Sequence, residues 1–175
     1  MADPNSYSHA ELVEAGCKWL RRQSCSVIVH EPFRCSINEQ PDAIGWREGA
    51  SILLEAKASR SDYLVDARKP WRREPALGVG DWRFFIAPLG MISVDELPDR
   101  WGLLELKGRR VLATHGVPGN IGWYRSAFPE ANKRNEIQLL ISAVGSPGVK
   151  PRPEIPLRRG IDIHAWREHL EEPCG

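Results

Sequence analysis

The chain has 175 residues, of which 42% are hydrophobic and 27% are charged. This length supplies enough apolar material for one buried core but too little for two full domains, and the composition excludes wholesale disorder. The 24 Lys and Arg nearly balance the 23 Asp and Glu, so the net charge of +1 does not by itself indicate an anionic partner.

The cysteines and the apolar runs bear on the compartment. Four cysteines, at positions 17, 25, 35 and 174, form no CxxC pair and no Cys/His cluster with zinc spacing. The N-terminus lacks the basic-then-apolar pattern of a secretion signal, and no apolar stretch approaches the roughly 20 residues of a membrane-spanning helix. We therefore expect a soluble cytoplasmic protein with reduced thiols and no membrane contact.

The first half of the chain predicts one helix followed by three strands. Apolar residues recur with helical spacing over residues 8–22, which is typical of an amphipathic helix. The β-branched run at 26–30 predicts a strand. Further strands are expected around 42–46 and 51–58, with Glu48-Gly49 as the hairpin turn between them.

The second half predicts a basic helix and further strands. Residues 59–62 have the Ser-x-x-acid spacing of a helix start, and Pro70 should end that helix. The predicted order is αβββαβ with additions, and we divide the chain into a domain at 1–145 and a C-terminal part at 146–175. The remaining predicted elements are a buried strand at 82–87, a hairpin at 101–106 and 110–113, a helix at 130–144, a Pro/Gly-rich loop at 145–160 and a short helix at 164–171.

Two carboxylates and a lysine stand at a spacing that suits phosphodiester hydrolysis. That chemistry needs hard oxygen ligands for a divalent metal, a water that the metal activates, and a cation near the phosphate. Asp42 precedes Glu55 by thirteen residues, so adjacent strands can bring the two together. Period-two alternation places Glu55 and Lys57 on one sheet face, with Ala56 directed into the core.

The surroundings of this set favour catalysis over an ordinary solvated sheet face. An acid-x-Lys pair alone is weak evidence, because alternating charges are common on exposed strands. Here the pair interrupts the apolar run Ile52-Leu53-Leu54, a Pro-Asp dipeptide lies at hairpin distance, and a basic helix follows at once.

These residues resemble a known family. Pro41-Asp42 and Leu54-Glu55-Ala56-Lys57, in the order αβββαβ, resemble the PD-(D/E)XK nuclease superfamily. Residues 55–64 are similar to the strand-to-helix passage of Holliday-junction resolvases. Residues 97–105 resemble segments of small phage or prophage nucleases of this superfamily. The resemblance covers residues 8–106, whereas 107–175 match nothing that we can name.

The resemblance implies a fold and a metal site. The fold would be α/β, with a restriction-endonuclease-like αβββαβ core, a mixed central sheet flanked by helices, and C-terminal additions. Asp42, Glu55 and the backbone carbonyl of Ala56 would bind Mg²⁺ or Mn²⁺. Lys57 would orient the attacking water or stabilise the charge of the phosphorane.

Many relatives add an acid from the first helix, and Glu11 is the candidate here. Glu14 lies on the opposite side of the predicted apolar stripe. His9 occupies the more inward position, so this chain departs from the family pattern at that point.

The stretch after the motif has a local basic excess. Six basic residues lie between Lys57 and Arg73 against two acids, which can attract phosphate. Ser59 and Arg60 would contact the scissile phosphate, although Ser59 is explained equally well as a helix cap. Four further residues would line a nucleic-acid groove, with a solvated helix face as the competing interpretation: Arg68, Lys69, Arg72 and Arg73.

The sequence therefore predicts a metal-dependent DNA endonuclease. The resolvase-like segment implies branched or damaged duplex as substrate, and a second copy of the chain is an expected partner. Two alternatives stay open. The chain could be a non-catalytic nucleic-acid-binding or protein-interaction module, although a degenerate site usually loses one of Asp42, Glu55 and Lys57. It could also cut RNA, because nothing in the sequence indicates how a 2′-hydroxyl would be treated.

Overall fold

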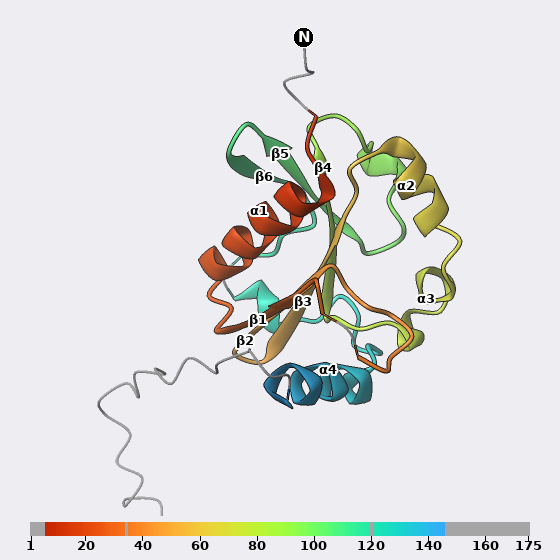
Figure 1. The fold of residues 1–175 in the computed structure, drawn as a ribbon. Helices are drawn as coiled ribbons and strands as arrows, with labels where there is room; N and C mark the ends of the chain where they lie inside the picture. Colours follow the sequence, from red (N-terminus) through yellow and green to blue (C-terminus); the bar gives the residue numbers. More distant parts are fainter. Residues whose placement is uncertain (1–5, 34, 120, 146–175) are drawn as a thin grey trace, which may run out of the picture.

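The computed structural model describes residues 6–33, 35–119 and 121–145. Within these ranges the fold is mixed α/β: a six-stranded sheet in the order β1-β2-β3-β4-β5-β6 is accompanied by four α-helices (Figure 1). The helices are α1 (His9–Arg22), α2 (Arg60–Asp66), α3 (Pro70–Arg73) and α4 (Lys133–Gly145), the strands are β1 (Val27–His30), β2 (Ala43–Arg47), β3 (Ala50–Ala56), β4 (Trp82–Pro88), β5 (Gly102–Lys107) and β6 (Arg110–His115), and the short 3₁₀ turns are η1 (Pro75–Leu77), η2 (Val94–Glu96) and η3 (Gly122–Tyr124).

The sheet combines antiparallel and parallel pairs. Strands β1, β2 and β3 form an antiparallel meander, β4 and β5 run parallel to β3, and β6 returns antiparallel to β5. The predicted turn between β2 and β3 is confirmed, because Arg47 pairs with Ala50 and leaves two residues to connect the strands. Gly49 in this turn has a φ of 73°, which a residue without a Cβ adopts at low cost.

Helix α1 covers one face of the sheet and begins at a capping box. Ser8 and Glu11 each bond the other's backbone N–H, which fixes the predicted start of the helix. Leu12, Gly16 and Leu20 are buried toward the sheet. A Cβ on Gly16 would stand 2.8 Å from Leu54 Cδ1, so the absence of a side chain allows α1 to pack closely on β3.

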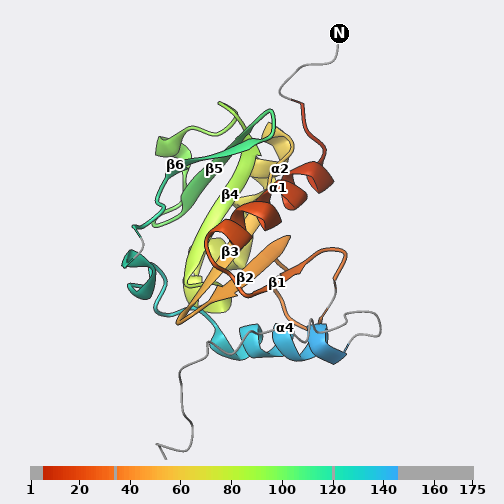
Figure 2. The same cartoon turned by 90° about the vertical axis from the view of Figure 1, so that its left-hand side faces the viewer.

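The opposite face carries a second apolar cluster beneath α2 and the segments that follow β4. Leu53 and Phe85 lie at its centre, and Tyr63 reaches it from α2. Phe85 stacks on Trp101 with ring centroids 4.5 Å apart. Figure 2 shows α1 on the near side of the sheet and α2 on the far side, so helices flank the sheet on both faces.

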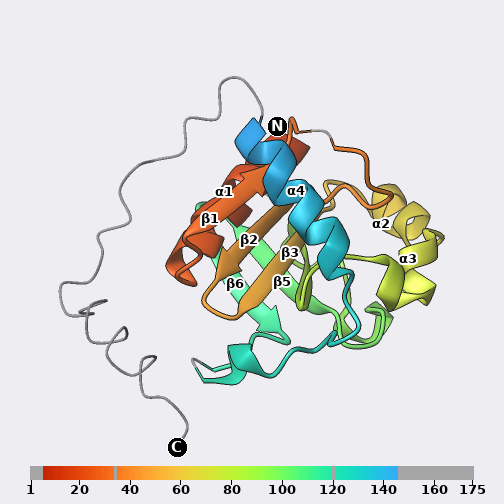
Figure 3. The same ribbon diagram turned by 90° about the horizontal axis from the view of Figure 1, so that it is seen from below.

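Helix α4 is anchored to the sheet through a buried acid. It runs across the β1–β3 end of the molecule, as seen from below in Figure 3, and contributes Leu139 to the second cluster. The Glu136 carboxylate accepts hydrogen bonds from Trp46 Nε1 at 3.3 Å, Ser51 Oγ at 3.0 Å and the Gly80 N–H at 2.9 Å. Because these donors come from β2, β3 and the loop before β4, one side chain ties α4 to three segments.

Some expected boundaries differ from the structure. The predicted basic helix ends at Asp66, and Pro70 starts α3 instead of only stopping α2, because a proline is accommodated in the first turn of a helix. The expected helix at 164–171 and the whole segment 146–175 lie outside the described residues. No helix in the described ranges is long and apolar enough to cross a bilayer.

Candidate active site

The ends of β2 and β3 bring the two predicted carboxylates together. Ala43 pairs with Leu54, so the antiparallel register places Asp42 opposite Glu55. Asp42 Oδ2 accepts a hydrogen bond from the Ala56 N–H at 2.7 Å, which holds this carboxylate against the end of β3. The arrangement follows from the two-residue hairpin turn, because that turn fixes which residues of β2 and β3 face each other.

Glu55 is buried, and only one of its carboxylate oxygens is hydrogen-bonded. Its side chain is 1% exposed, and Oε2 accepts from Lys57 Nζ at 3.0 Å. Oε1 has no hydrogen-bond partner among the described residues. A buried carboxylate oxygen without a partner is costly, so this atom marks a position at which a cation would be stabilising.

Burial and the neighbouring carboxylate of Glu55 make ionisation of Asp42 unfavourable. Burial, followed by the nearby negative charge of Glu55, raises the pKa of Asp42 to about 6. The hydrogen bond from Ala56 and the charges of His9 and Lys57 act in the opposite direction without cancelling the rise. Two adjacent carboxylates thus repel each other here.

Lys57 lies on the same face as Glu55, as period two requires. Its side chain is 7% exposed, and Nζ donates to Asp66 Oδ1 at 2.9 Å as well as to Glu55. Burial lowers the pKa of Lys57, but the carboxylates of Glu55 and Asp66 outweigh it and raise the pKa above its ordinary value. The side chain is therefore an ammonium held between two acids, and Ala56 is buried on the opposite face.

The prediction that Arg72 lines a nucleic-acid groove is wrong, because its side chain is buried. Its side chain is 2% exposed and donates to Glu39 Oε1 at 2.8 Å and Asp66 Oδ2 at 2.5 Å. Its Nη2 lies 3.4 Å from Glu55 Oε2, and its guanidinium stands 4.3 Å from the ring centroid of Trp101. Arg72 is thus a buried counter-ion for acids that come from other segments, and its charge does not reach the surface.

Ser59 and Arg60 also have intramolecular partners. Ser59 is the N-cap of α2, and its hydroxyl accepts from the Asp62 N–H at 3.2 Å. Arg60 forms a two-pronged ion pair with Glu96, with Nη1 at 2.8 Å from Oε2. The cap interpretation of Ser59 is therefore confirmed, and Arg60 would have to leave Glu96 to bind a phosphate.

The remaining basic residues of this stretch differ in their exposure and in whether they form ion pairs within the protein. Lys69 is partly exposed and pairs with Asp66 at 2.6 Å. Arg68 and Arg73 are exposed and form no ion pair with any described residue. Of the six predicted nucleic-acid contacts, these two arginines are the ones whose charge is available to a phosphate.

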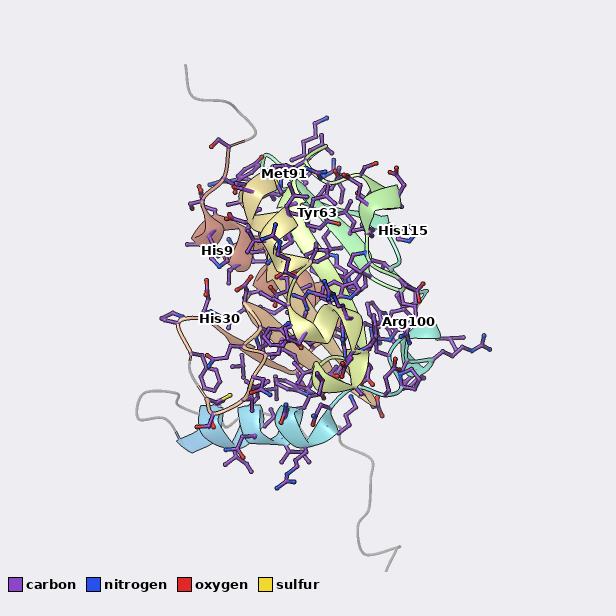
Figure 4. The ribbon with its side chains drawn as sticks, turned by 90° about the vertical axis from the view of Figure 1, so that its right-hand side faces the viewer. His9, His30, Tyr63, Met91, Arg100 and His115 are labelled. Atoms are coloured by element: carbon purple, nitrogen blue, oxygen red, sulfur yellow. The ribbon has the colours of Figure 1, made fainter. Side chains whose placement is uncertain are left out.

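Glu11 does not reach the carboxylate pair. Its side chain is exposed and bonds back to Ser8, as the capping box requires. The neighbouring His9 takes the inward place, with Nε2 at 2.5 Å from Glu31 Oε1 and 3.6 Å from Asp42 Oδ1. In Figure 4, His9 projects from α1 on the side of the molecule where His30 ends β1.

The comparisons with known proteins give no family for this chain. No family model matches it, and no curated protein matches it. A solved structure, the SPO1766 protein of unknown function from Silicibacter pomeroyi, aligns with a TM-score of 0.49 and 18% identity, over 82% of this chain and 99% of that one. A likeness at this level concerns only the course of the chain.

Proposed function

We propose that the chain is a divalent-metal-dependent nuclease of the PD-(D/E)XK kind that hydrolyses phosphodiester bonds of DNA. The observation that carries the proposal is the meeting of Asp42 and Glu55 at the ends of two paired strands, with one buried Glu55 oxygen unpaired and the Lys57 ammonium beside it. An antiparallel β1–β3 meander, followed by a helical crossover to a parallel β4, supports a restriction-endonuclease-like core.

The residues present fit a hard divalent cation. Asp42, Glu55 and the carbonyl of Ala56 offer oxygen ligands, which Mg²⁺ and Mn²⁺ prefer. The unpaired Oε1 of Glu55 leaves a buried oxygen available to such an ion, and the pKa of Asp42, raised by burial and by the charge of Glu55, supports the same placement. When bound, the ion would supply an activated water and polarise the phosphoryl oxygen.

Lys57 would act on the reacting phosphate. Its ammonium is compact and held by Glu55 on one side and Asp66 on the other, so its position is fixed before substrate binds. A fixed positive charge stabilises the negative charge that develops on the phosphorane more than it stabilises the substrate, which raises the rate rather than the affinity. Arg68 and Arg73 would bind phosphates outside the reacting position.

The test is cleavage of supercoiled plasmid, branched DNA and RNA by the full chain in Mg²⁺, Mn²⁺ or EDTA. We expect metal-dependent cutting of DNA that is lost in Lys57→Ala and Glu55→Gln. Lys18→Ala, an exposed lysine on α1, is the matched control and should cut normally. Circular dichroism of each variant separates loss of chemistry from loss of fold.

Four results would overturn the proposal or part of it. Full activity of Lys57→Ala, or cleavage that persists in EDTA, would exclude the mechanism. Binding of DNA without turnover in any metal would indicate the non-catalytic module. Cleavage of RNA alone would replace the substrate class while leaving the site in place.

A further inference from the structure

A second group of potential metal ligands lies beside the carboxylate pair. Among the described residues, His9, Glu31 and Asp42 each offer one ligand atom, and these atoms lie within 4.8 Å of one another. The three come from different segments: the first residue of α1, the residue that follows β1, and the residue that precedes β2. Glu31 and His9 are absent from the ligand set that the sequence predicted.

Backbone contacts hold this group in place without the help of a metal. The Glu31 N–H donates to the Asp42 carbonyl at 3.0 Å, which continues the β1–β2 pairing and sets the two residues side by side. Asp42 Oδ2 is occupied by the Ala56 N–H, so Oδ1 is the oxygen that faces His9. His9 directly follows the N-cap Ser8, so the start of α1 sets its backbone position, and its Nε2 lies 2.5 Å from Glu31 Oε1. Ligands that are positioned by their own backbone lose little entropy on binding.

The charges around the group do not balance. Two carboxylates face one imidazole, which supplies at most a single positive charge. Glu55, which lies opposite Asp42, does not change this balance, because its own carboxylate is paired with Lys57 and lies 3.4 Å from Arg72 Nη2. His9 and Glu31 are 43% and 40% exposed, so an ion can enter from solvent. A surface ion pair between His9 and Glu31 would contribute only about 0–1 kcal/mol to the stability of the fold. Such a pair would also leave the position of Asp42 beside it unexplained.

We infer that His9, Glu31 and Asp42 bind a divalent transition-metal ion. The chemistry of the donors selects the class of ion, since an imidazole nitrogen with carboxylate oxygens suits Mn²⁺, Zn²⁺ or Ni²⁺, whereas Mg²⁺ favours an all-oxygen shell. The site shares Asp42 with the proposed nuclease site, but it stands on its own ligand geometry and does not depend on cleavage activity.

The test uses the full metal-free chain with Mn²⁺ alone and pulsed electron paramagnetic resonance, which detects nitrogen bound directly to manganese. The wild-type protein should show nitrogen modulation from an imidazole, and His9→Gln should lose it. His115→Gln, an exposed histidine of β6, is the matched control and should keep it. Glu31→Gln should weaken Mn²⁺ binding at least about tenfold in a calorimetric titration.

A Glu55→Gln variant separates this inference from the proposed function. It should retain the nitrogen modulation, because Glu55 is outside the ligand set, even though cleavage is expected to be lost. Unchanged modulation in His9→Gln, its absence in manganese-loaded wild type, or its loss in Glu55→Gln would overturn the assignment. If the wild-type protein cut no nucleic acid but showed the His9-dependent modulation, the metal site would stand and the nuclease proposal would fail.

Discussion

Replacing Asp42 by Asn should stabilise the metal-free protein at neutral pH, although Asp42 belongs to the proposed site. Burial and the charge of Glu55 raise the pKa of Asp42 from 3.8 to about 6. At about 1.4 kcal/mol per pH unit, this rise disfavours the ionised carboxylate by about 3 kcal/mol in the folded state. An Asn side chain carries no charge and can still accept the Ala56 N–H, so the repulsion is removed while the hydrogen bond remains.

The pH dependence gives the sign of this effect. Protonated Asp42 contributes stability that is fully present below the unfolded-state pKa of 3.8 and is lost as the pH rises through about 6. The gain from Asn should therefore be close to about 3 kcal/mol above pH ~7 and fall to about 1 kcal/mol near pH ~4.5. Urea denaturation in EDTA at these two pH values, followed by tryptophan fluorescence, measures the difference in the free energy of unfolding.

The control for this experiment is Asp99→Asn. Asp99 has a side chain that is 93% exposed, so its replacement should change the free energy of unfolding by less than about 0.5 kcal/mol at both pH values. A loss of stability in Asp42→Asn that is equal at both pH values would refute the reasoning, because it would show that the carboxylate is held by its contacts and not strained by its charge.

Three other perturbations follow from the structure. Arg72→Met should lower the free energy of unfolding by about 3–5 kcal/mol in urea titrations, because it leaves the buried Glu39 carboxylate without its ion-pair partner. Arg73→Met is the control and should change the free energy of unfolding by less than about 0.5 kcal/mol. Neutralising Arg68 and Arg73 together should reduce the slope of log K for DNA binding against log salt concentration by the equivalent of about two phosphate contacts. An unchanged slope would place the binding surface elsewhere. Gly16→Val should cost about 1–3 kcal/mol in thermal unfolding, since its Cβ would meet Leu54 Cδ1 at 2.8 Å; a neutral result would mean that α1 can shift.

The pairing of Asp42 with Glu55 could be predicted because local rules determine it. A turn of two residues fixes the register of a hairpin, and the register together with period two decides which side chains share a face. The start of α1 was equally readable, since Ser8 and Glu11 have the capping-box spacing. That same spacing was the available signal that Glu11 turns back toward Ser8 and does not approach the sheet.

The ion-pair partners of the basic residues between 57 and 73 could not be predicted from the neighbouring sequence. Counting charges between residues 57 and 73 gave a basic excess, but Arg72 meets Glu39 and Arg60 meets Glu96, 33 and 36 positions away in the chain. Only the folded arrangement brings those acids near. Asp66 shows the same limit, because it reads as an ordinary helix acid until Lys57 and Arg72 are seen to converge on it.

The anchoring of α4 bears on how much of the chain is needed to fold. The segment on which we base the proposed nuclease assignment ends near residue 106, well before α4 begins at Lys133. Removing α4 would take away Glu136, the acceptor for Trp46, Ser51 and the Gly80 N–H, and would leave part of the second apolar cluster open to water. A protein shortened to end near residue 106 would thus expose unpaired hydrogen-bond donors and apolar surface, and we expect it to aggregate. We therefore expect a fragment that keeps α4 (Lys133–Gly145) to stay soluble where one that ends near residue 106 does not.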